Sequence, residues 1–372
     1  MSRQVVVTGL GVVTAYGLGR KIFWDGIKSG ESAIRAIDWE GWEEAPIQVL
    51  ARVRETVPEN ESRSLFWARE ALREALEMSQ PGRDGGLAGA IGWPGPNEQE
   101  GGDPLARLAS ETGIGGPRVE SLAACAASTQ VIGEAFRMIR EGESDWMAAG
   151  GADGRAHPGG LMGYDRLGAL VRGFRDRPQE ACQPFGRERS GFVVGEGAGF
   201  LVLEEKERAK KRGAKILAEI HGAAEGCDAW RVTDPREDTQ EAVACVEACL
   251  RDAGIRPEDV DSVVAHGTGT PANDRAEARM LAQVFGRKQP RLNAPKARMG
   301  HLSMACGAVE SVLAVQSLAE DFFPSTAGPF WQADPDCPVR MVQGRGEKGV
   351  RMVLKPSFGF GGQNACLLFH RA

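Results

Sequence analysis

The stretch VESLAACAASTQVIGEAFRMIREGESDWMAAGGAD, residues 119–153, indicates a strand, a helix and a second strand in succession. VESLAAC leads as a strand into TQVIGEAFRMIREG, whose apolar side chains recur at helical spacing, and WMAAGGAD is typical of a buried strand. Strands that alternate with helices form parallel sheets covered by helices. The stretch therefore predicts a layered α/β fold.

The same alternation runs through the rest of the chain. Further strand-like runs lie at 5–10, 86–93, 218–224 and 260–265, further helix-like runs at 64–79, 241–254, 275–286 and 307–320, and a strand, glycine-rich turn and strand close the chain at 350–370. Residues 93–117, rich in Gly and Pro, read as a loop.

The second half of the chain repeats the layout of the first, without an obvious repeat of residues. The division falls near 205–215, in the basic helical segment KERAKKRGAK and not in a flexible linker. We therefore expect two similar halves that are docked together, 1–208 and 209–372.

Composition excludes several classes of protein. The 372 residues carry a formal charge of −6 with scattered signs, which argues against a nucleic-acid-binding surface. The eight cysteines form no C-x-x-C pair, so neither a zinc site nor a disulfide framework is indicated, and we expect no metal. Cys245 and Cys249 share a helix face and are interpreted as core residues.

The N-terminal segment resembles a secretion signal but is better explained as a strand. Arg3 precedes an apolar run, 5–13, which is mostly Val and is broken by Thr8, Gly9 and Gly11. Gly9 and Gly11 also suggest a dinucleotide-binding turn, but the third glycine is missing. No run reaches the roughly 18 apolar residues of a membrane span. We expect a soluble, cytoplasmic protein without a membrane or dinucleotide site.

Cys125 is a candidate nucleophile because of its position in the sequence, between an apolar run and the start of a helix. It follows the apolar residues 122–124 and precedes a helix that begins within 126–129. The positive end of a helix dipole and nearby N–H groups favour a thiolate, and the small neighbours leave room for a substrate carbonyl. Taken alone, such a residue is more often an inert buried cysteine than a nucleophile.

Two of the five histidines lie in glycine-flanked turns. His266 ends the strand-like VVAHGTGTP, and His301 follows Lys296 by five residues in NAPKARMGHLSMACGAVE, ahead of a helix whose Gly307 permits close packing. A lone histidine is more often a core residue than a catalyst. The presence of two histidines in such turns favours a catalytic role for them.

These segments together resemble the β-ketoacyl synthases, in particular the carrier-protein-dependent elongating type with a thiolase-like fold. The resemblance covers almost the whole chain. It is carried in order by LAACAAST, QPFGRERSGFVVGEGAGFLVLEE with ERAKKRGAKI, HGTGTPAND, KARMGHL with GAVES, and SFGFGGQNA. It implies five layers, α-β-α-β-α. Initiating synthases use Cys, His and Asn, and thiolases a second cysteine near the C-terminus; the combination HGTGTP and K-x-x-x-x-H fits neither.

The resemblance also implies the residues of the site. Cys125, His266 and His301 would be catalytic, with Lys296 holding charge and geometry near His301. Phe358 would contact the substrate and Phe360 would gate the acyl site. Further residues would contact the phosphopantetheine arm (Thr268, Thr270) or support the structure (Glu310, Asp274, Glu277). No metal or redox cofactor is implied.

The implied activity is that of a 3-oxoacyl-[acyl-carrier-protein] synthase, an acyltransferase of fatty-acid or polyketide synthesis. Its partner would be an acyl carrier protein. Because such a partner is acidic, this chain would need a local basic patch to bind it. We also expect a homodimer or a heterodimer with a homologous subunit. Two alternatives remain open: a polyketide or aryl-polyene ketosynthase subunit acting with a non-catalytic partner, and a homologue that binds carrier protein without condensing.

Four departures from the family pattern are visible. The segment between GAIGW and Cys125 is shorter than in the usual elongating enzymes, where it helps to wall the acyl pocket. Ser128 replaces a glycine three residues after the cysteine. Asn273 replaces a glycine in the His266 loop, and Pro356 stands where Asn is usual. None of these changes removes a reacting group.

Overall fold

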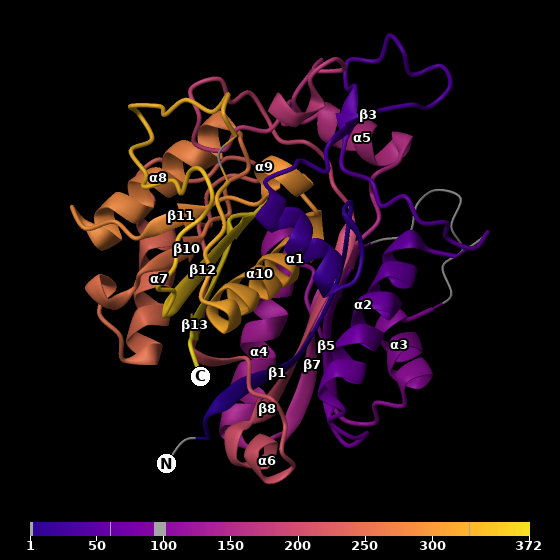
Figure 1. Cartoon of the computed structure of the whole chain (residues 1–372), viewed down its shortest axis with the longest axis vertical. Helices are drawn as coiled ribbons and strands as arrows, with labels where there is room; N and C mark the ends of the chain where they lie inside the picture. Colours follow the sequence, from indigo (N-terminus) through magenta and orange to yellow (C-terminus); the bar gives the residue numbers. More distant parts are fainter. Residues whose placement is uncertain (1–2, 60, 93–101, 327) are drawn as a thin grey trace.

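The computed structural model describes residues 3–59, 61–92, 102–326 and 328–372. Figure 1 shows strands in the interior with helices on their faces. The helices are α1 Arg20–Ser29, α2 Arg63–Ser79, α3 Pro104–Thr112, α4 Ala127–Glu141, α5 Pro158–Asp165, α6 Lys206–Lys211, α7 Gln240–Ala253, α8 Pro271–Phe285, α9 Lys296–Met299 and α10 Cys306–Glu320.

Within the described residues, one mixed sheet of eleven strands runs through the molecule in the order β11-β10-β12-β13-β9-β1-β8-β7-β5-β6, with β2 paired to β1. A separate short ribbon joins β3 and β4. The strands are β1 Val5–Thr14, β2 Gly17–Leu18, β3 Arg35–Ala36, β4 Val49–Leu50, β5 Gly86–Ile91, β6 Arg118–Glu120, β7 Trp146–Asp153, β8 Gly197–Glu205, β9 Ala218–Cys227, β10 Ser262–Val264, β11 Arg291–Asn293, β12 Met352–Gly359 and β13 Gln363–His370.

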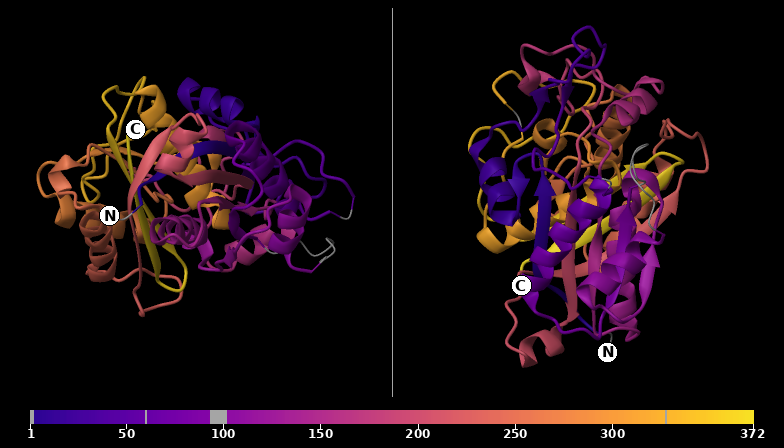
Figure 2. Two further views of the ribbon diagram at one scale, coloured as in Figure 1. Left: turned by 90° about the horizontal axis from the view of Figure 1, so that it is seen from below. Right: turned by 90° about the vertical axis from the view of Figure 1, so that its right-hand side faces the viewer.

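The strand order of the first half is repeated in the second. From the edge inward, β6-β5-β7-β8-β1 corresponds to β11-β10-β12-β13-β9, with parallel outer pairs and antiparallel inner pairs in both. The innermost strands β1 and β9 pair antiparallel, with Val5 opposite Ile220. Figure 2 shows the two halves side by side. The layered α/β fold with two similar halves is therefore confirmed.

The cores account for the layers. Helices α2 and α3 pack one apolar cluster against β1, β5, β7 and β8, and α7 and α8 pack another against β9 to β13. Between them lie α4 and α10, whose cluster touches strands of both halves. The close crossing of these helices requires Gly307, because a Cβ there would lie 2.0 Å from Oγ1 of Thr129.

The N-terminal strand forms as predicted. All ten residues of β1 are buried between β8 and β9, which explains why the run is β-branched yet interrupted by glycine. None of the helices in the described ranges is long and apolar enough to cross a membrane. Cys245 and Cys249 are buried in the core of the second half, as predicted. The boundary between 208 and 209 falls inside α6 and stays a prediction.

Two expectations near the nucleophile were wrong. Part of 93–117 is helical, since α3 begins after Asp103, whose carboxylate accepts from the N–H groups of Leu105 and Ala106. Residues 93–101 of that segment lie outside the described ranges. The strand before Cys125 is limited to β6, because the backbone turns at Ala124, where φ is 49°.

Candidate active site

Cys125 lies in a short 3₁₀ turn, η1 Ala124–Ala126, between β6 and α4. Its side chain is 7 % exposed. The glycine-rich turn that joins β12 to β13 presses on it: a Cβ at Gly359 would lie 2.7 Å from the carbonyl oxygen of Ala123 and 3.2 Å from the Cys125 nitrogen. Only glycine allows this approach, and it fixes the left-handed backbone of Ala124.

The second half repeats this turn without its nucleophile. The 3₁₀ turn η4, Ser303–Ala305, precedes α10 as η1 precedes α4, and Ser303 has φ of 46° where Ala124 has 49°. Met304 thus occupies the place that corresponds to Cys125. Of the two equivalent turns, only the one in the first half therefore carries a cysteine at this place.

Burial raises the pKa of the Cys125 thiol to about 11, although Lys296 and then Arg155 act to lower it. Loss of hydration outweighs the favourable charges, so the pKa does not support the expectation that the start of a helix favours a thiolate here.

His266 is held by its backbone and by Lys296. The Lys296 ammonium donates to the His266 carbonyl oxygen at 2.6 Å and lies 3.4 Å from the ring nitrogen Nδ1. An ammonium only donates, so Nδ1 is the acceptor and the ring proton is on Nε2. Burial, and then the charge of Lys296, hold the pKa of His266 well below its usual value. The ring is neutral.

His301 reaches the same state by another route. Its Nδ1 accepts the backbone N–H of Ser303 at 2.9 Å, so Nε2 carries the proton. Burial holds the pKa of this ring too well below its usual value, with Lys296 as the second cause. The rings of His266 and His301 stand edge to face, with centroids 5.7 Å apart. Two neutral imidazoles, each with an N–H on Nε2, suit an incoming oxyanion.

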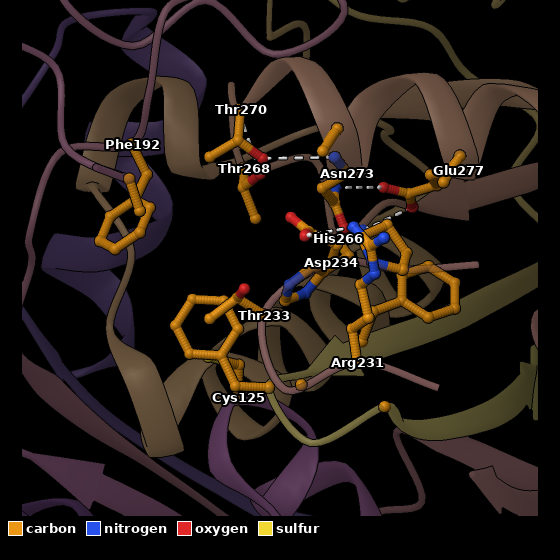
Figure 3. Close-up of a pocket in the computed structure, with 18 of the residues that line it drawn as sticks. Cys125, Phe192, Arg231, Thr233, Asp234, His266, Thr268, Thr270, Asn273 and Glu277 are labelled. Carbon is orange, nitrogen blue, oxygen red and sulfur yellow. Dashed lines mark hydrogen bonds and ion pairs between the residues drawn. The ribbon is translucent and has the colours of Figure 1, made fainter. Parts of the chain in front are cut away.

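These residues face one cavity of about 300 Å³. Cys125, His266, His301, Phe358 and Phe360 line it together with Thr268 and Thr270. In Figure 3, Cys125 lies below and the two threonines above, with His266 between. The structure thus brings the predicted catalytic and substrate-contacting residues together.

Lys296 contacts His266 and Glu310 through its ammonium group. Its charge also lowers the pKa of His301, so it acts on both rings. Glu310 pairs through Oε1 with Lys296 and through Oε2 with Lys355, which is 2.9 Å away. All three side chains are completely buried. Sequence reasoning missed Lys355; a lysine inside the apolar strand-like run VRMVLKPSF was its only signal.

Asp274 and Glu277 hold the loop that follows β10. The carboxylate of Asp274 accepts from the N–H groups of Phe185, Thr268 and Gly269, and that of Glu277 accepts from His266 and Gly267. Burial raises the pKa of both, that of Glu277 to about 7. The contacts agree with the supporting role expected of these two residues.

The remaining predicted residues lie around the opening. Thr270 caps α8 by accepting the Asn273 N–H, and its hydroxyl lies 2.9 Å from that of Thr268. The Phe358 ring stands edge-on to His266 at 5.8 Å. Next to Phe360, Gly361 donates to the Val232 carbonyl oxygen at 2.7 Å. The segment 228–239, which sequence reasoning missed, therefore supports the turn that carries Phe360.

The family departures make specific contacts. The Ser128 hydroxyl accepts the N–H of Ala308 at 3.0 Å, so it caps the start of α10. Asn273 donates to the carboxylates of Asp274 and Glu277. These side chains add hydrogen bonds around the site that glycine could not make.

Comparison with known proteins places the chain in a family. The β-ketoacyl synthase N-terminal domain matches residues 2–80 and 103–209, and the β-ketoacyl synthase C-terminal domain matches residues 217–328. The chain belongs to the β-ketoacyl synthase family. The unmatched gap, 81–102, includes part of the segment that the sequence indicated to be shortened.

A relative within this family is 3-oxoacyl-[acyl-carrier-protein] synthase 2 of Coxiella burnetii. It is 33% identical, and the match covers 99% of each chain. The aligned length is 413 positions, more than the 372 residues of this chain, so this β-ketoacyl synthase homologue carries deletions relative to that protein.

Solved structures show the same fold. A ketosynthase of a type II polyketide synthase, in complex with its acyl-carrier protein (AntDE:AntF) and bound to the hexaketide, is 28% identical with a TM-score of 0.91. The ishigamide ketosynthase/chain length factor is 29% identical with a TM-score of 0.86. Both matches cover 100% of each chain. The thiolase-like fold of the ketosynthases is thereby confirmed.

Proposed function

We propose that this protein is a 3-oxoacyl-acyl-carrier-protein synthase that condenses an acyl-enzyme thioester with a malonyl thioester. The observation that carries the proposal is one cavity lined by a buried thiol, Cys125, and two neutral imidazoles, His266 and His301, each with a donor on Nε2. The assignment of these three residues as catalytic rests on that geometry and on the family pattern.

In the first step, Cys125 sulfur attacks the carbonyl carbon of an acyl thioester. The carbon–sulfur bond to the carrier arm breaks, the acyl group stays on Cys125, and the cysteine proton ends on the departing carrier thiol. The backbone N–H groups of Cys125 and Phe360 would stabilise the oxyanion. The proximity of Gly359 to the Cys125 turn supports that pairing.

In the second step, the malonyl thioester loses carbon dioxide and its electron pair forms an enolate. The Nε2–H groups of His266 and His301 would donate to the enolate oxygen, each contributing about 3 kcal/mol or more to the transition state. The enolate carbon then attacks the Cys125 thioester. Cys125 leaves as a thiolate and regains a proton, which releases the 3-oxoacyl product.

An acyl carrier protein is the partner that we propose for both steps. Beside the cavity opening, Arg231, Arg236, Arg275 and Arg279 line a second hollow with the exposed Trp230 and three acidic residues, Asp234, Glu237 and Asp238. Arg231 pairs with Asp234 and Arg236 with Asp238, so Arg275 and Arg279 are the two arginines offered to a partner. Carrier proteins are acidic, and clustered arginines attract such surfaces. Arg275→Glu with Arg279→Glu should raise the KM for acyl-carrier protein about tenfold while leaving acylation by a pantetheine thioester unchanged. Equal loss with both donors would contradict docking at these arginines.

A dimer with a second copy of this chain or with a homologous subunit is the assembly that we propose. β6 is an edge strand that pairs only with β5 among the described strands, and Leu122 beside it is 58 % exposed. Exposed edges and apolar side chains of this kind are usually covered. Light scattering that finds an active monomer at micromolar concentration would overturn this. The two halves, 1–208 and 209–372, and a cytoplasmic location are likewise proposals.

A polyketide or aryl-polyene ketosynthase subunit is the second candidate. Its support is the full-length likeness to AntDE:AntF and to the ishigamide ketosynthase/chain length factor. A non-condensing homologue is disfavoured because Cys125, Lys296 and His301 are all present. Mass spectrometry of Cys125 after incubation with a panel of acyl carrier proteins separates these candidates: no acylation by any donor would contradict a synthase.

A further inference from the structure

Three polar side chains meet beside Cys125, and the proposed mechanism uses none of them. Arg155 follows β7, Tyr164 lies on α5, and Ser303 begins η4. The Arg155 guanidinium donates to the Tyr164 hydroxyl oxygen at 2.9 Å, and the hydroxyls of Tyr164 and Ser303 are 2.8 Å apart. The buried Asp153 carboxylate lies 3.4 Å from Arg155 and balances its charge.

The cluster faces the reacting side of the cavity. Tyr164 lines the same space as Cys125, and its ring packs at 5.3 Å against Phe192, which in turn lies 4.8 Å from the His301 ring. The backbone N–H of Ser303 is the group that fixes His301. Thr268 and Thr270, where the carrier arm is proposed to bind, lie away from Cys125 in Figure 3. An acyl group on Cys125 would therefore be the part of the substrate near Tyr164.

Counting protons shows that the cluster has a donor to spare. An arginine has no acceptor, so the Tyr164 oxygen must accept from Arg155. Tyr164 and Ser303 then bring two hydroxyl protons and share one hydrogen bond. The other proton has no hydrogen-bond partner among the described residues. Ser303 is buried and does not line the cavity, whereas Tyr164 does, so the arrangement that serves a ligand has Ser303 donating to Tyr164 and Tyr164 donating into the cavity.

We propose that Tyr164 is a specificity-determining residue: its hydroxyl donates to an oxygen on the acyl chain close to the thioester, so Cys125 accepts 3-oxoacyl groups in preference to saturated groups of equal length. The inference rests on the proposed function. A neutral carbonyl oxygen fits better than a carboxylate, because Asp153 already neutralises Arg155. An alkyl chain would leave the buried donor unpaired, which costs binding free energy.

The test uses two thioesters that differ only at carbon 3, acetoacetyl-pantetheine and butyryl-pantetheine. The rate of Cys125 acylation by each is followed by intact-protein mass spectrometry in the parent, in Tyr164→Phe and in Tyr16→Phe. Tyr16 is the only other tyrosine of the chain, and its hydroxyl bonds to the Glu31 carbonyl oxygen away from the cavity, so its variant is a matched control. Comparing ratios removes the greater intrinsic reactivity of the acetoacetyl thioester.

We expect Tyr164→Phe to lower the acetoacetyl-to-butyryl rate ratio about fivefold to tenfold, the usual effect of one hydrogen bond, with butyryl acylation nearly unchanged. Tyr16→Phe should keep the parent ratio. The same ratio in all three proteins overturns the inference and leaves the proposed function standing. Failure of both thioesters to acylate Cys125 in the parent counts instead against the proposed function. Melting curves identify a variant that is misfolded, and Tyr164→Trp, which also lacks the phenol donor, then repeats the comparison.

Discussion

The ammonium group of Lys296 donates to the backbone oxygen of His266 at 2.6 Å and lies 3.4 Å from Nδ1 of the same ring. This contact sets the tautomer of His266 and helps to keep the ring neutral. The tautomer of His301 is set instead by the backbone N–H of Ser303, while the charge of Lys296 lowers the pKa of this ring too. The two imidazoles are therefore equivalent as donors, although different groups set their tautomers.

The Lys296–Glu310–Lys355 cluster should respond unequally to loss of its members. Glu310→Gln leaves two completely buried ammonium groups without a counter-charge, and we expect it to lower the free energy of unfolding by about 3–5 kcal/mol. Lys355→Met leaves the Lys296–Glu310 pair intact and should lower the free energy of unfolding clearly less than Glu310→Gln does. Urea denaturation of both variants measures the difference. A larger loss for Lys355→Met would show that the charge balance assigned to Glu310 is wrong.

The capping role of Ser128 predicts a modest loss of stability. Ser128→Ala removes the acceptor for the Ala308 N–H at the start of α10 and should lower the free energy of unfolding by about 1 kcal/mol. Ser110→Ala, at an exposed position on α3, is the control and should change stability by much less. If urea denaturation finds the two variants equal, the hydrogen bond to α10 contributes nothing to the folded state.

The pKa of Cys125 can be read from its alkylation. Burial raises this pKa to about 11, so the rate of iodoacetamide modification should keep rising with pH from 7 through 9 without a plateau. Lys296→Met should slow the reaction at every pH in that range, because Lys296 lowers the pKa of Cys125. The Cys125→Ala protein supplies the background from the exposed Cys227. A plateau below pH 8 would indicate a thiolate that burial should prevent.

The histidines predict how stability changes with acid. Burial lowers the pKa of His266 and His301 in the folded chain below the ordinary value of about 6.5, so the folded state binds fewer protons than the unfolded state. The contribution of the two neutral rings to the free energy of unfolding is complete above about pH 6.5 and is lost progressively as the pH falls from there toward their lower folded-state pKa values. We expect the urea midpoint to fall less steeply between pH 6.5 and 5 in the double variant His266→Gln, His301→Gln than in the parent. Identical slopes would contradict neutral, buried rings.

Much of the fold could be predicted from the sequence, because its signals are local. The all-buried β1 is visible as a β-branched run, and the α10 helix is visible in GAVESVLAVQSLAE. The helix α3 was hidden by glycines and prolines on its N-terminal side, although Asp103 followed by Pro104 is a helix-start signal. The strand before Cys125 was overestimated because the left-handed turn at Ala124 has no sequence signature when the residue is alanine.

The site shows the same limit. The sequence motifs identified Cys125, His266 and His301 as candidate site residues. They could not predict the pKa of Cys125, because that pKa depends on how completely the turn is buried. The second lysine on Glu310 and the Tyr164 cluster join side chains from distant segments. Glu310 and Lys355 meet within the second half, and Ser303 of that half joins Arg155 and Tyr164 of the first. These contacts form only in the folded chain, so no spacing along the sequence could reveal them.

Cys125 is proposed to carry the acyl group while His266 and His301 stabilise the enolate, and one comparison tests this division of roles directly. Carbon dioxide release from malonyl-loaded acyl carrier protein and acylation of Cys125 are measured in Cys125→Ala and in His301→Ala, each with a melting curve. Cys125→Ala should lose acylation and keep slow carbon dioxide release. Folded His301→Ala should keep acylation while decarboxylation falls about a hundredfold or more, the usual loss for one oxyanion donor. Carbon dioxide release at the parent rate from folded His301→Ala would contradict the proposal that His301 stabilises the enolate.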